Sequence, residues 1–418
     1  MPLRDEAVAI GKRAKVAASR LAQVSTDEKN RVLLRMAEEL GEQQGRLLDA
    51  NQKDLEAARK AEVSPALLDR IALNPSRIQA MAKGIREVVA LPDPVREIIK
   101  MWRRPNGLQV GRMRIPLGVI AIIYEARPNV TADAAVLCLK SGNAVILRGG
   151  SEAFFSNQAI GEVLRAACRG SEVPEESIQV VQSKDRGMVY ELLQLDNYID
   201  LVIPRGGEEL IASVTANSRV PVVKHFKGVC HVYIDSEASL EMAERISLNA
   251  KVQRPSVCNA METLLVNEAI APKFLPAVIA KLQQAGVEIR GCKKTQALVP
   301  GVKAATETDW TTEYLDLILS IRVVEDMDEA IDHIERYGSQ HTEAIVTSDY
   351  ARAREFIDRV NSSAVMVNAS TRFNDGGELG LGAEIGISTS KIHAFGPMGL
   401  EELTTTKFVV LGDGQIRE

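Results

Sequence analysis

A regular alternation of apolar runs and helix-like segments begins at Gly118, and it restricts the fold more than any other feature of the sequence. The run Val119–Tyr124 is continuously apolar, which is typical of a strand buried on both faces. Four further strand-like runs follow at 144–147, 178–181, 201–203 and 221–224, separated by helix-like segments near 131–140, 153–169, 186–194 and 207–217. This alternation predicts an α/β fold with a doubly wound parallel sheet, which binds ligands at the carboxyl ends of its strands.

The sequence before this sheet predicts helices and a ribbon. Between residues 3 and 90 apolar positions recur at helical spacing, as from Val32 to Leu40, and we expect these helices to serve packing. Residues 103–115 contain a Pro-Asn-Gly turn followed by alternating residue types, which predicts a β-hairpin. Because a two-stranded ribbon is only marginally stable by itself, we expect this one to pack against another domain or subunit.

A second α/β pattern covers the C-terminal half of the chain. Strand-like runs fall at 262–266, 287–290, 315–324, 343–347 and 364–368, with helix-like segments near 270–284, 327–336 and 350–359. The tail Thr404–Leu411 predicts one further strand, and we expect its partner to be the hairpin of a neighbouring subunit. A chain of 418 residues is long enough for two or three domains, each with its own core.

The composition argues against several classes of function. A net charge of −5 disfavours a nucleic-acid or anionic-membrane partner, and an aromatic content of 4% supplies few platforms for stacking bases. No apolar signal segment follows Met1, and the longest apolar run, roughly ten residues, is too short to span a bilayer, so we expect a cytoplasmic protein. The five cysteines form no Cys-x-x-Cys pair and do not cluster with histidines, so we expect no metal site and a reducing compartment.

Two turns at predicted strand ends combine arginine with glycine. They are Arg148-Gly-Gly-Ser151 and Pro204-Arg-Gly-Gly207. Glycine allows close approach of the backbone and arginine supplies positive charge, which together suit a phosphate group. Glycine-bearing turns are also common in any α/β protein, and the chain has neither a Gly-x-Gly-x-x-Gly fingerprint after a strand nor a Walker loop. The residues alone leave both interpretations open.

Cys258 is the candidate nucleophile. Pro255 disfavours helical geometry for Arg254, so we expect the cysteine on a turn between a helix and the strand that follows. Lys251 and Arg254 lie shortly upstream, and nearby cations stabilise the reactive thiolate. The alternative is a buried structural thiol, because free cysteine is among the most buried residue types.

The chain resembles the aldehyde dehydrogenase superfamily along nearly its full length, and within it the gamma-glutamyl phosphate reductases. The strings that carry the resemblance are residues 115–130, 140–152, 252–260, 367–382 and 393–402. The resemblance implies an NADP-binding domain formed by residues 1–100 and 118–225, a catalytic domain at 226–400, and an oligomerisation hairpin and tail strand at 101–117 and 401–418. It therefore also implies a homo-oligomer.

The resemblance assigns roles to individual residues. It makes Cys258 the nucleophile and Asn129 the oxyanion-hole donor, acting with the backbone N–H of Cys258. Arg127 and Arg254 flank these two residues, and we expect them to meet the phosphate or carboxylate of the substrate, although either arginine is as readily a surface or ion-paired residue. The implied cofactor-binding residues are Arg148, Ser151, Arg205, Gly206, Gly207 and Glu313, the last holding the nicotinamide ribose.

NADP is the expected cofactor. NAD enzymes of the superfamily tend to carry a glutamate at the position of Ser151, where it would repel a 2′-phosphate, and Arg148 can attract one. Glu152 is adjacent, and a shift of the turn by one residue would weaken this expectation. The implied reaction is the NADPH-dependent reduction of L-glutamyl 5-phosphate to L-glutamate 5-semialdehyde and phosphate in L-proline biosynthesis, with functional coupling to the upstream glutamate kinase.

One departure from the superfamily concerns water activation. Where the wider superfamily has a glutamate that activates water against the thioester, this chain has His225, which is either a base or a packed histidine at a strand end. We therefore expect phosphate to be the acyl acceptor in the oxidative direction. Two other classes stay open: a hydrolytic or CoA-acylating aldehyde dehydrogenase, and a catalytically silent scaffold.

Overall fold

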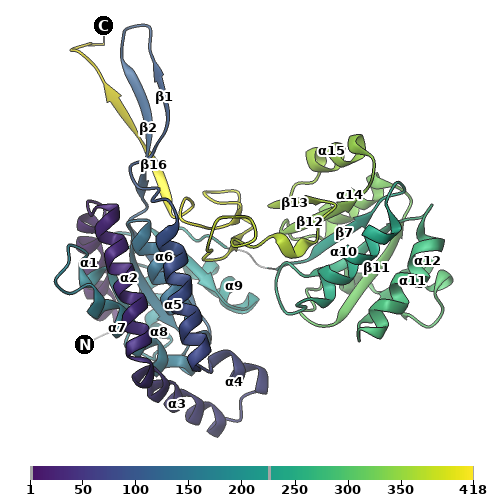
Figure 1. The fold of residues 1–418 in the computed structure, drawn as a ribbon, viewed down its shortest axis with the longest axis horizontal. Helices are drawn as coiled ribbons and strands as arrows, with labels where there is room; N and C mark the ends of the chain where they lie inside the picture. The colour runs from purple at the N-terminus through teal and green to yellow at the C-terminus, as the bar shows by residue number, and fades with distance from the viewer. Residues whose placement is uncertain (1–2, 225–226, 418) are drawn as a thin grey trace. The chain divides into compact units, whose positions relative to one another are not determined.

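The computed structural model describes residues 3–224 and 227–417, and the chain divides into two compact units. The first unit consists of Met1–Lys224, Leu381–Gly386 and Met398–Glu418, and the second of His225–Gly380 and Ile387–Pro397. The second unit is therefore inserted into the first, which the chain re-enters near its end (Figure 1).

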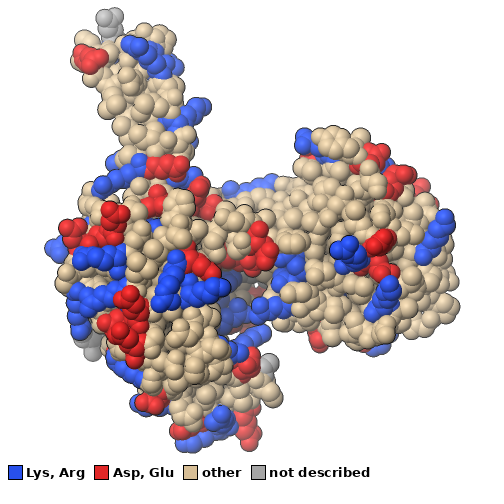
Figure 2. Space-filling model, viewed as in Figure 1, with Lys and Arg blue, Asp and Glu red and all other residues tan. Residues whose placement is uncertain are grey.

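Five helices open the first unit. They are α1 (Leu3–Leu21), α2 (Thr26–Glu42), α3 (Gln44–Lys60), α4 (Pro65–Ile71) and α5 (Pro75–Ala90). The side chain of Ser25 accepts a hydrogen bond from the Glu28 N–H and so caps α2. Val32, Met36 and Leu40 are buried along α2, which confirms the helical spacing read from the sequence. Figure 2 shows acidic and basic side chains interspersed over these helices, so this face carries no large patch of one sign.

A parallel sheet forms the centre of the first unit. Its strands are β3 (Val119–Tyr124), β4 (Ala144–Gly149), β5 (Ile178–Val180) and β6 (Leu201–Arg205), in the order β5-β4-β3-β6. The connecting helices are α6 (Asn129–Lys140), α7 (Phe154–Ala167), α8 (Gly187–Leu193) and α9 (Glu208–Asn217). Every residue of β3 is buried, as its apolar run predicted. The α/β fold class expected from the sequence is confirmed.

The predicted fifth strand at 221–224 is wrong. This segment makes one isolated parallel bridge, Val202 with Val222, instead of a strand. The carbonyl oxygen of Pro221 accepts from the Val202 N–H at 2.9 Å, but proline has no N–H to return to a ladder. The apolar run alone did not reveal that pairing would stop there.

A three-stranded antiparallel ribbon completes the first unit. It contains β1 (Ile98–Arg103), β2 (Gln109–Pro116) and β16 (Thr404–Leu411), in the order β1-β2-β16, and Figure 1 shows it extending away from the helices of that unit. The expectation that the tail strand pairs with a neighbouring subunit is wrong, because β16 pairs with β2 of its own chain, Thr404 opposite Pro116. The Asn143 side chain donates to the Leu403 carbonyl at 2.8 Å and so holds the chain beside β2.

The second unit contains a seven-stranded parallel sheet in the order β10-β9-β11-β8-β7-β12-β13. Its strands are β7 (Cys230–Ile234), β8 (Met261–Asn267), β9 (Glu288–Gly291), β10 (Lys303–Ala304), β11 (Ile318–Val324), β12 (Thr342–Val346) and β13 (Ala364–Val367). Its helices are α10 (Leu240–Val252), α11 (Ala271–Gln284), α12 (Lys293–Leu298), α13 (Glu307–Trp310), α14 (Met327–Tyr337) and α15 (Tyr350–Arg359). The short strands β14 (Ile387–Ser388) and β15 (Gly396–Pro397) pair with each other.

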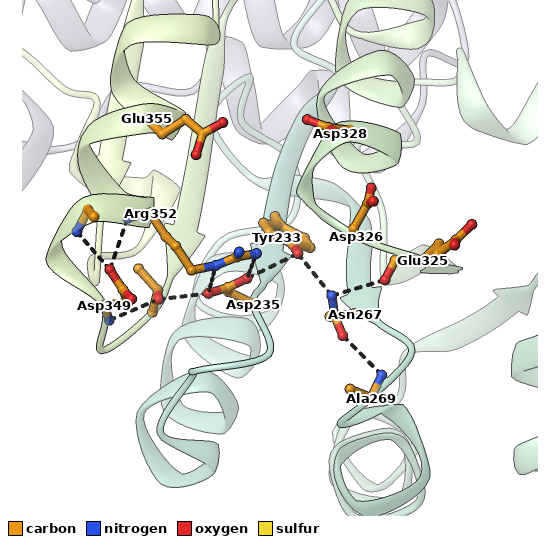
Figure 3. A network of polar contacts seen from close by, with 12 residues as sticks. Tyr233, Asp235, Asn267, Ala269, Glu325, Asp326, Asp328, Asp349, Arg352 and Glu355 are labelled. Atoms are coloured by element: carbon orange, nitrogen blue, oxygen red, sulfur yellow. Dashed lines mark hydrogen bonds and ion pairs between the residues drawn. The ribbon is translucent and has the colours of Figure 1, made fainter.

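A buried polar network closes the carboxyl end of strand β7 (Figure 3). Asp235 has no exposed surface, and the Arg352 guanidinium donates to both of its carboxylate oxygens, at 2.5 and 2.7 Å. The hydroxyl groups of Thr347 and Tyr233 donate to the same carboxylate at 2.8 and 3.2 Å. Burial opposes ionisation, but Arg352 and Thr347 hold the pKa of Asp235 below its ordinary value. The network therefore fastens α15 to the sheet.

Candidate active site

Cys258 lies on the turn between α10 and β8, as the sequence predicted. The thiol-bearing residue is half-buried, whereas Cys138, Cys168 and Cys230 are buried. Burial raises the pKa of the Cys138 thiol and of the Cys168 thiol, which keeps both protonated. Of these four cysteines, Cys258 is the one whose position combines access with a turn between elements.

Gly228 and Cys230 both constrain the backbone of the Cys258 turn. A Cβ on Gly228 would lie 2.0 Å from the Cys258 carbonyl oxygen, so the two backbone segments approach as closely as glycine allows. The Cys230 thiol donates to the same carbonyl oxygen at 3.1 Å. Burial raises the pKa of the Cys230 thiol well above its ordinary value, which keeps it a donor. The carbonyl of the nucleophile is thus constrained by two residues at or just before the start of β7, the strand that precedes α10 in the chain.

Arg372, which no pattern in the sequence indicated, lies beside this turn. Its guanidinium donates to the Gln253 side chain at 2.9 Å and to the Asn259 side-chain oxygen, while Asn259 donates to the Asn374 carbonyl at 3.0 Å. Burial and then the positive charge of Arg254 lower the pKa of Arg372, whereas Asp375 and, to a smaller extent, Cys258 raise it. The string 367–382 had carried the resemblance, but nothing in it distinguished Arg372 from a surface arginine.

Two guanidinium groups therefore act on the surroundings of Cys258. Arg254 is exposed and Arg372 is half-buried, and both belong to the second unit. Positive charge of this kind stabilises a thiolate and attracts an anionic substrate group. The role of Arg254 in binding the substrate stays a prediction, and Arg372 becomes a second candidate for the same role.

The predicted turns of the first unit follow strands β3, β4 and β6. Because these strands are parallel, the turns lie together at the carboxyl edge of the sheet. The Glu125 N–H donates to the Arg205 carbonyl at 3.0 Å, and the Gly207 N–H donates to the Glu125 carboxylate at 2.9 Å. A Cβ on Gly206 would lie 2.6 Å from the Glu125 carboxyl carbon, so a larger residue would displace this contact. Glu125, which was not among the predicted site residues, thus shapes the turn that carries Arg205, Gly206 and Gly207.

Arg148 lies at the same edge with its guanidinium turned to backbone carbonyls. It donates to Gly149 at 3.1 Å and to Lys184 and Asp185 at 3.4 Å. Its Nε is buried and has no hydrogen-bond partner within the part of the chain that the structure describes, and burial lowers the pKa of Arg148. Arg186, directly before the helix that begins at Gly187, adds positive charge that lowers the pKa of Arg148 further, and no pattern in the sequence indicated it.

Ser151 and Asn129 are both exposed at this edge. The Ser151 hydroxyl donates to the Glu152 carboxylate at 3.3 Å, so a negatively charged side chain lies next to Ser151 on the turn that follows β4. Asn129 is the first residue of α6, and its side-chain amide donates to the Asp133 carboxylate at 2.9 Å. An amide has a second N–H, which leaves Asn129 a donor for a ligand. Arg127 is exposed two residues earlier on the same turn.

The remaining predicted positions lie elsewhere. Glu313 belongs to the second unit, in the loop between α13 and β11, and is half-buried. His225 lies outside the described residues. Among residues 3–224 and 227–417, no group of three His, Cys, Asp or Glu side chains is arranged to hold a metal ion. No helix in that part of the chain is long and apolar enough to cross a membrane.

Comparison with known proteins adds the decisive observation. The profile of the aldehyde dehydrogenase family matches residues 4–297. The gamma-glutamyl phosphate reductase of Moorella thermoacetica is 59% identical over 408 residues, which cover 98% of this chain and 98% of the relative. That of Geobacter metallireducens is 56% identical over 418 residues, covering 100% of both chains. The chain belongs to the gamma-glutamyl phosphate reductases of the aldehyde dehydrogenase family. Membership makes it an oxidoreductase.

Solved structures agree with this family. The crystal structure of gamma-glutamyl phosphate reductase from Thermotoga maritima matches with a TM-score of 0.97 and 49% identity, over 99% of this chain and 100% of that chain. An acetylating aldehyde dehydrogenase from Geobacillus thermoglucosidasius matches with a TM-score of 0.69 at 18% identity, over 100% of this chain and 98% of that chain. At that identity the likeness shows the shared fold alone.

Proposed function

We propose that the chain is a cytoplasmic, NADP-dependent glutamate-5-semialdehyde dehydrogenase (phosphorylating). It reduces L-glutamyl 5-phosphate to L-glutamate 5-semialdehyde and phosphate in L-proline biosynthesis. The observation that carries this proposal is the Cys258 turn, where a half-buried thiol lies beside two arginines in a chain 59% identical to a gamma-glutamyl phosphate reductase. An acyl phosphate needs a nucleophile and cationic partners, and this turn supplies both.

The proposed chemistry begins at the Cys258 sulfur. The thiolate attacks the acyl carbonyl carbon, the Asn129 amide and the Cys258 N–H stabilise the oxyanion, and phosphate leaves with the bonding electron pair, which gives a thioester. Arg254 and Arg127 bind the anionic groups of the substrate, with Arg372 as a further candidate. NADPH, when bound, supplies the hydride that the thioester carbonyl accepts. The thiolate then departs from the hemithioacetal and the aldehyde is released.

The residues of the first unit fit a nicotinamide cofactor with a 2′-phosphate. The buried Nε of Arg148 has no hydrogen-bond partner among the described residues, and Arg186 adds charge that would attract a phosphate. The Gly206 turn has no room for a side chain, as suits close approach of a pyrophosphate. We propose that Arg148 and Ser151 hold the adenosine ribose, that Arg205, Gly206 and Gly207 hold the pyrophosphate, and that Glu313 holds the nicotinamide ribose. No metal is required.

The ribbon is the proposed oligomerisation element. Phe408 is 66% exposed and Val410 is 54% exposed on β16, which leaves apolar surface for another copy of the chain to cover. We propose a homo-oligomer on this basis, and functional coupling to the glutamate kinase that would supply the acyl phosphate.

An assay of the oxidative direction tests the proposal. We expect the semialdehyde to reduce NADP only when phosphate is present, because phosphate is already an anion and needs little activation to attack the thioester. Arsenate should replace phosphate, and His225→Ala should change the rate only modestly. Cys258→Ala should abolish turnover, with Cys138→Ala as the matched control that keeps it.

Other outcomes identify the alternatives. Rapid oxidation to free glutamate without phosphate would identify a hydrolytic enzyme, and loss of that activity in His225→Ala would name the histidine as its base. Turnover that requires coenzyme A would identify an acylating enzyme. A protein without turnover or nucleotide binding would be a silent scaffold.

A further inference from the structure

A buried ion pair spans the base of the Cys258 turn. The Lys251 ammonium lies 2.6 Å from one oxygen of the Glu262 carboxylate, and the two side chains are 0% and 1% exposed. Lys251 is in the last turn of α10 and Glu262 is the second residue of β8. Cys258 lies between Lys251 and Glu262 in sequence. The ion pair therefore joins α10, which precedes the Cys258 turn, to β8, which follows it.

The second oxygen of the same carboxylate reaches a different loop. It accepts a hydrogen bond from the Leu315 N–H at 3.2 Å, two residues beyond Glu313. Leu315 has φ +54°, a left-handed conformation that a leucine adopts only when its surroundings require it. Glu262 therefore holds this backbone in a conformation that the sequence does not favour.

Tyr314 adds a further connection. The Lys251 ammonium lies 5.8 Å from the centre of the Tyr314 ring, and the Tyr314 hydroxyl donates to Asp309 at 2.7 Å. The loop from α13 to β11 is thus in contact with both members of the pair. Glu313, between Thr312 and Tyr314, is carried by this loop.

A contribution to folding stability does not by itself explain the buried Lys251–Glu262 ion pair. Burial lowers the pKa of Lys251 and raises the pKa of Glu262 to about 7, so the fold disfavours both charges in isolation. Well-packed apolar residues of similar volume often serve stability as well as a buried ion pair does. What apolar residues cannot supply is an acceptor for the Leu315 N–H and a fixed direction for the two elements that meet there.

We propose that Lys251 and Glu262 are positioning residues that tie the Cys258 turn to the loop carrying Glu313. The tie keeps the nucleophile and the carboxylate assigned to the nicotinamide ribose in a fixed relation within the second unit. The inference rests on the proposed function for the role of Glu313.

The test compares Glu262→Gln and the double variant Lys251→Met with Glu262→Met against Asp235→Asn, all in the full chain. Asp235 is an equally buried member of an ion pair in the same sheet, at the end of β7 (Figure 3). We measure thermal unfolding, the KM for NADPH, kcat, and the rate at which iodoacetamide alkylates Cys258, read from the peptide that contains it.

We expect Glu262→Gln and the double variant to raise the KM for NADPH by about tenfold, the effect of losing one hydrogen bond to a charged group. Both should also alter the alkylation rate of Cys258, while Asp235→Asn lowers the melting temperature and changes neither quantity. In a Glu313→Gln background the effect of Glu262→Gln on the KM should disappear. The double variant removes both charges together and so leaves no unpaired buried charge. It therefore tests how the pair positions the Cys258 turn and the Glu313 loop without the destabilisation that a single buried charge would cause.

Two results overturn the inference. One is a double variant that folds and has the wild-type KM and alkylation rate, and the other is an effect of Glu262→Gln that persists in full with Glu313→Gln. A wild-type protein that lacks NADPH-dependent turnover instead overturns the proposed function. The alkylation rates of the variants still show whether the pair fixes the Cys258 turn.

Discussion

Gly228→Ala should impair catalysis by moving the nucleophile. The added Cβ would lie 2.0 Å from the Cys258 carbonyl oxygen and 2.8 Å from the Cys258 Cα. An ordinary contact begins at 3.4 Å, so the two backbone segments must part by about 1.4 Å at the oxygen. Both segments are backbone, and neither can yield by rotating a side chain. The displacement also lengthens the contact between the Cys230 thiol and the same oxygen, which is 3.1 Å in the wild type.

The size of the effect follows from this displacement. A misplacement of about 1 Å at a reacting centre costs about 100-fold in rate, which corresponds to about 2.7 kcal/mol in the activation free energy. Overpacking costs a further 1–3 kcal/mol or so in the free energy of unfolding. We therefore expect kcat to fall by about 100-fold or more, with a lower melting temperature and unchanged affinity for NADPH, because the cofactor-binding turns belong mostly to the first unit.

The assay measures NADP reduction by the semialdehyde in phosphate buffer, with thermal unfolding and NADPH titration on the same samples. Gly84→Ala is the matched control, because a Cβ at Gly84 in α5 would meet no atom of the described residues within 4 Å. That variant should keep the wild-type kcat and gain about 1 kcal/mol of stability from helix propensity. A folded Gly228→Ala protein with wild-type kcat would refute the reasoning, since the turn would then tolerate the shift.

Three further predictions concern charge. Ser151→Glu should move cofactor preference from NADP towards NAD, whereas Ser151→Gln, of the same size without the charge, should not; equal effects in kcat/KM would remove electrostatics as the cause. Arg254→Lys and Arg127→Lys should each raise the KM for the acyl substrate more than the KM for NADPH, and an unchanged value would take that residue out of the site. Burial lowers the pKa of His333 from 6.5 to about 2, so the folded chain resists a proton that the unfolded chain accepts. The free energy of unfolding should therefore fall as pH drops below 6.5, and His333→Phe should flatten that dependence in chemical denaturation.

The sequence was most informative where structure depends on near neighbours. The six apolar residues of β3 and the proline after Arg254 act locally, and both predictions were confirmed. Strand β7 was missed because His231 interrupts its apolar pattern. The structure buries that histidine against Glu343, which accepts from its backbone N–H at 2.9 Å and lies 2.8 Å from its ring nitrogen. Since Glu343 is 112 residues away in sequence, no local pattern could reveal the pairing.

The site followed the same rule. Cys258 and the glycine turns were visible because residue types at a turn carry their own chemistry. Glu125 and Arg372 were not selected, because their importance lies in contacts with Gly207 and Asn259 that only the folded chain creates. The partner of the tail strand was wrong for a related reason: alternation predicts a strand but does not name its neighbour.

The insertion of the second unit has a consequence for the nascent chain. Strand β2 ends at Pro116 and its partner β16 begins at Thr404, with the whole second unit between them. At about 5–20 residues per second, a ribosome needs roughly 15 to 60 s to travel from one to the other. During that interval one edge of β2 is unpaired and open to strands from other nascent chains on the same message. Translation speed therefore sets how long the edge of β2 stays unpaired. Slow codons before β16 would favour domain-swapped molecules, in which β16 of one chain pairs with β2 of another.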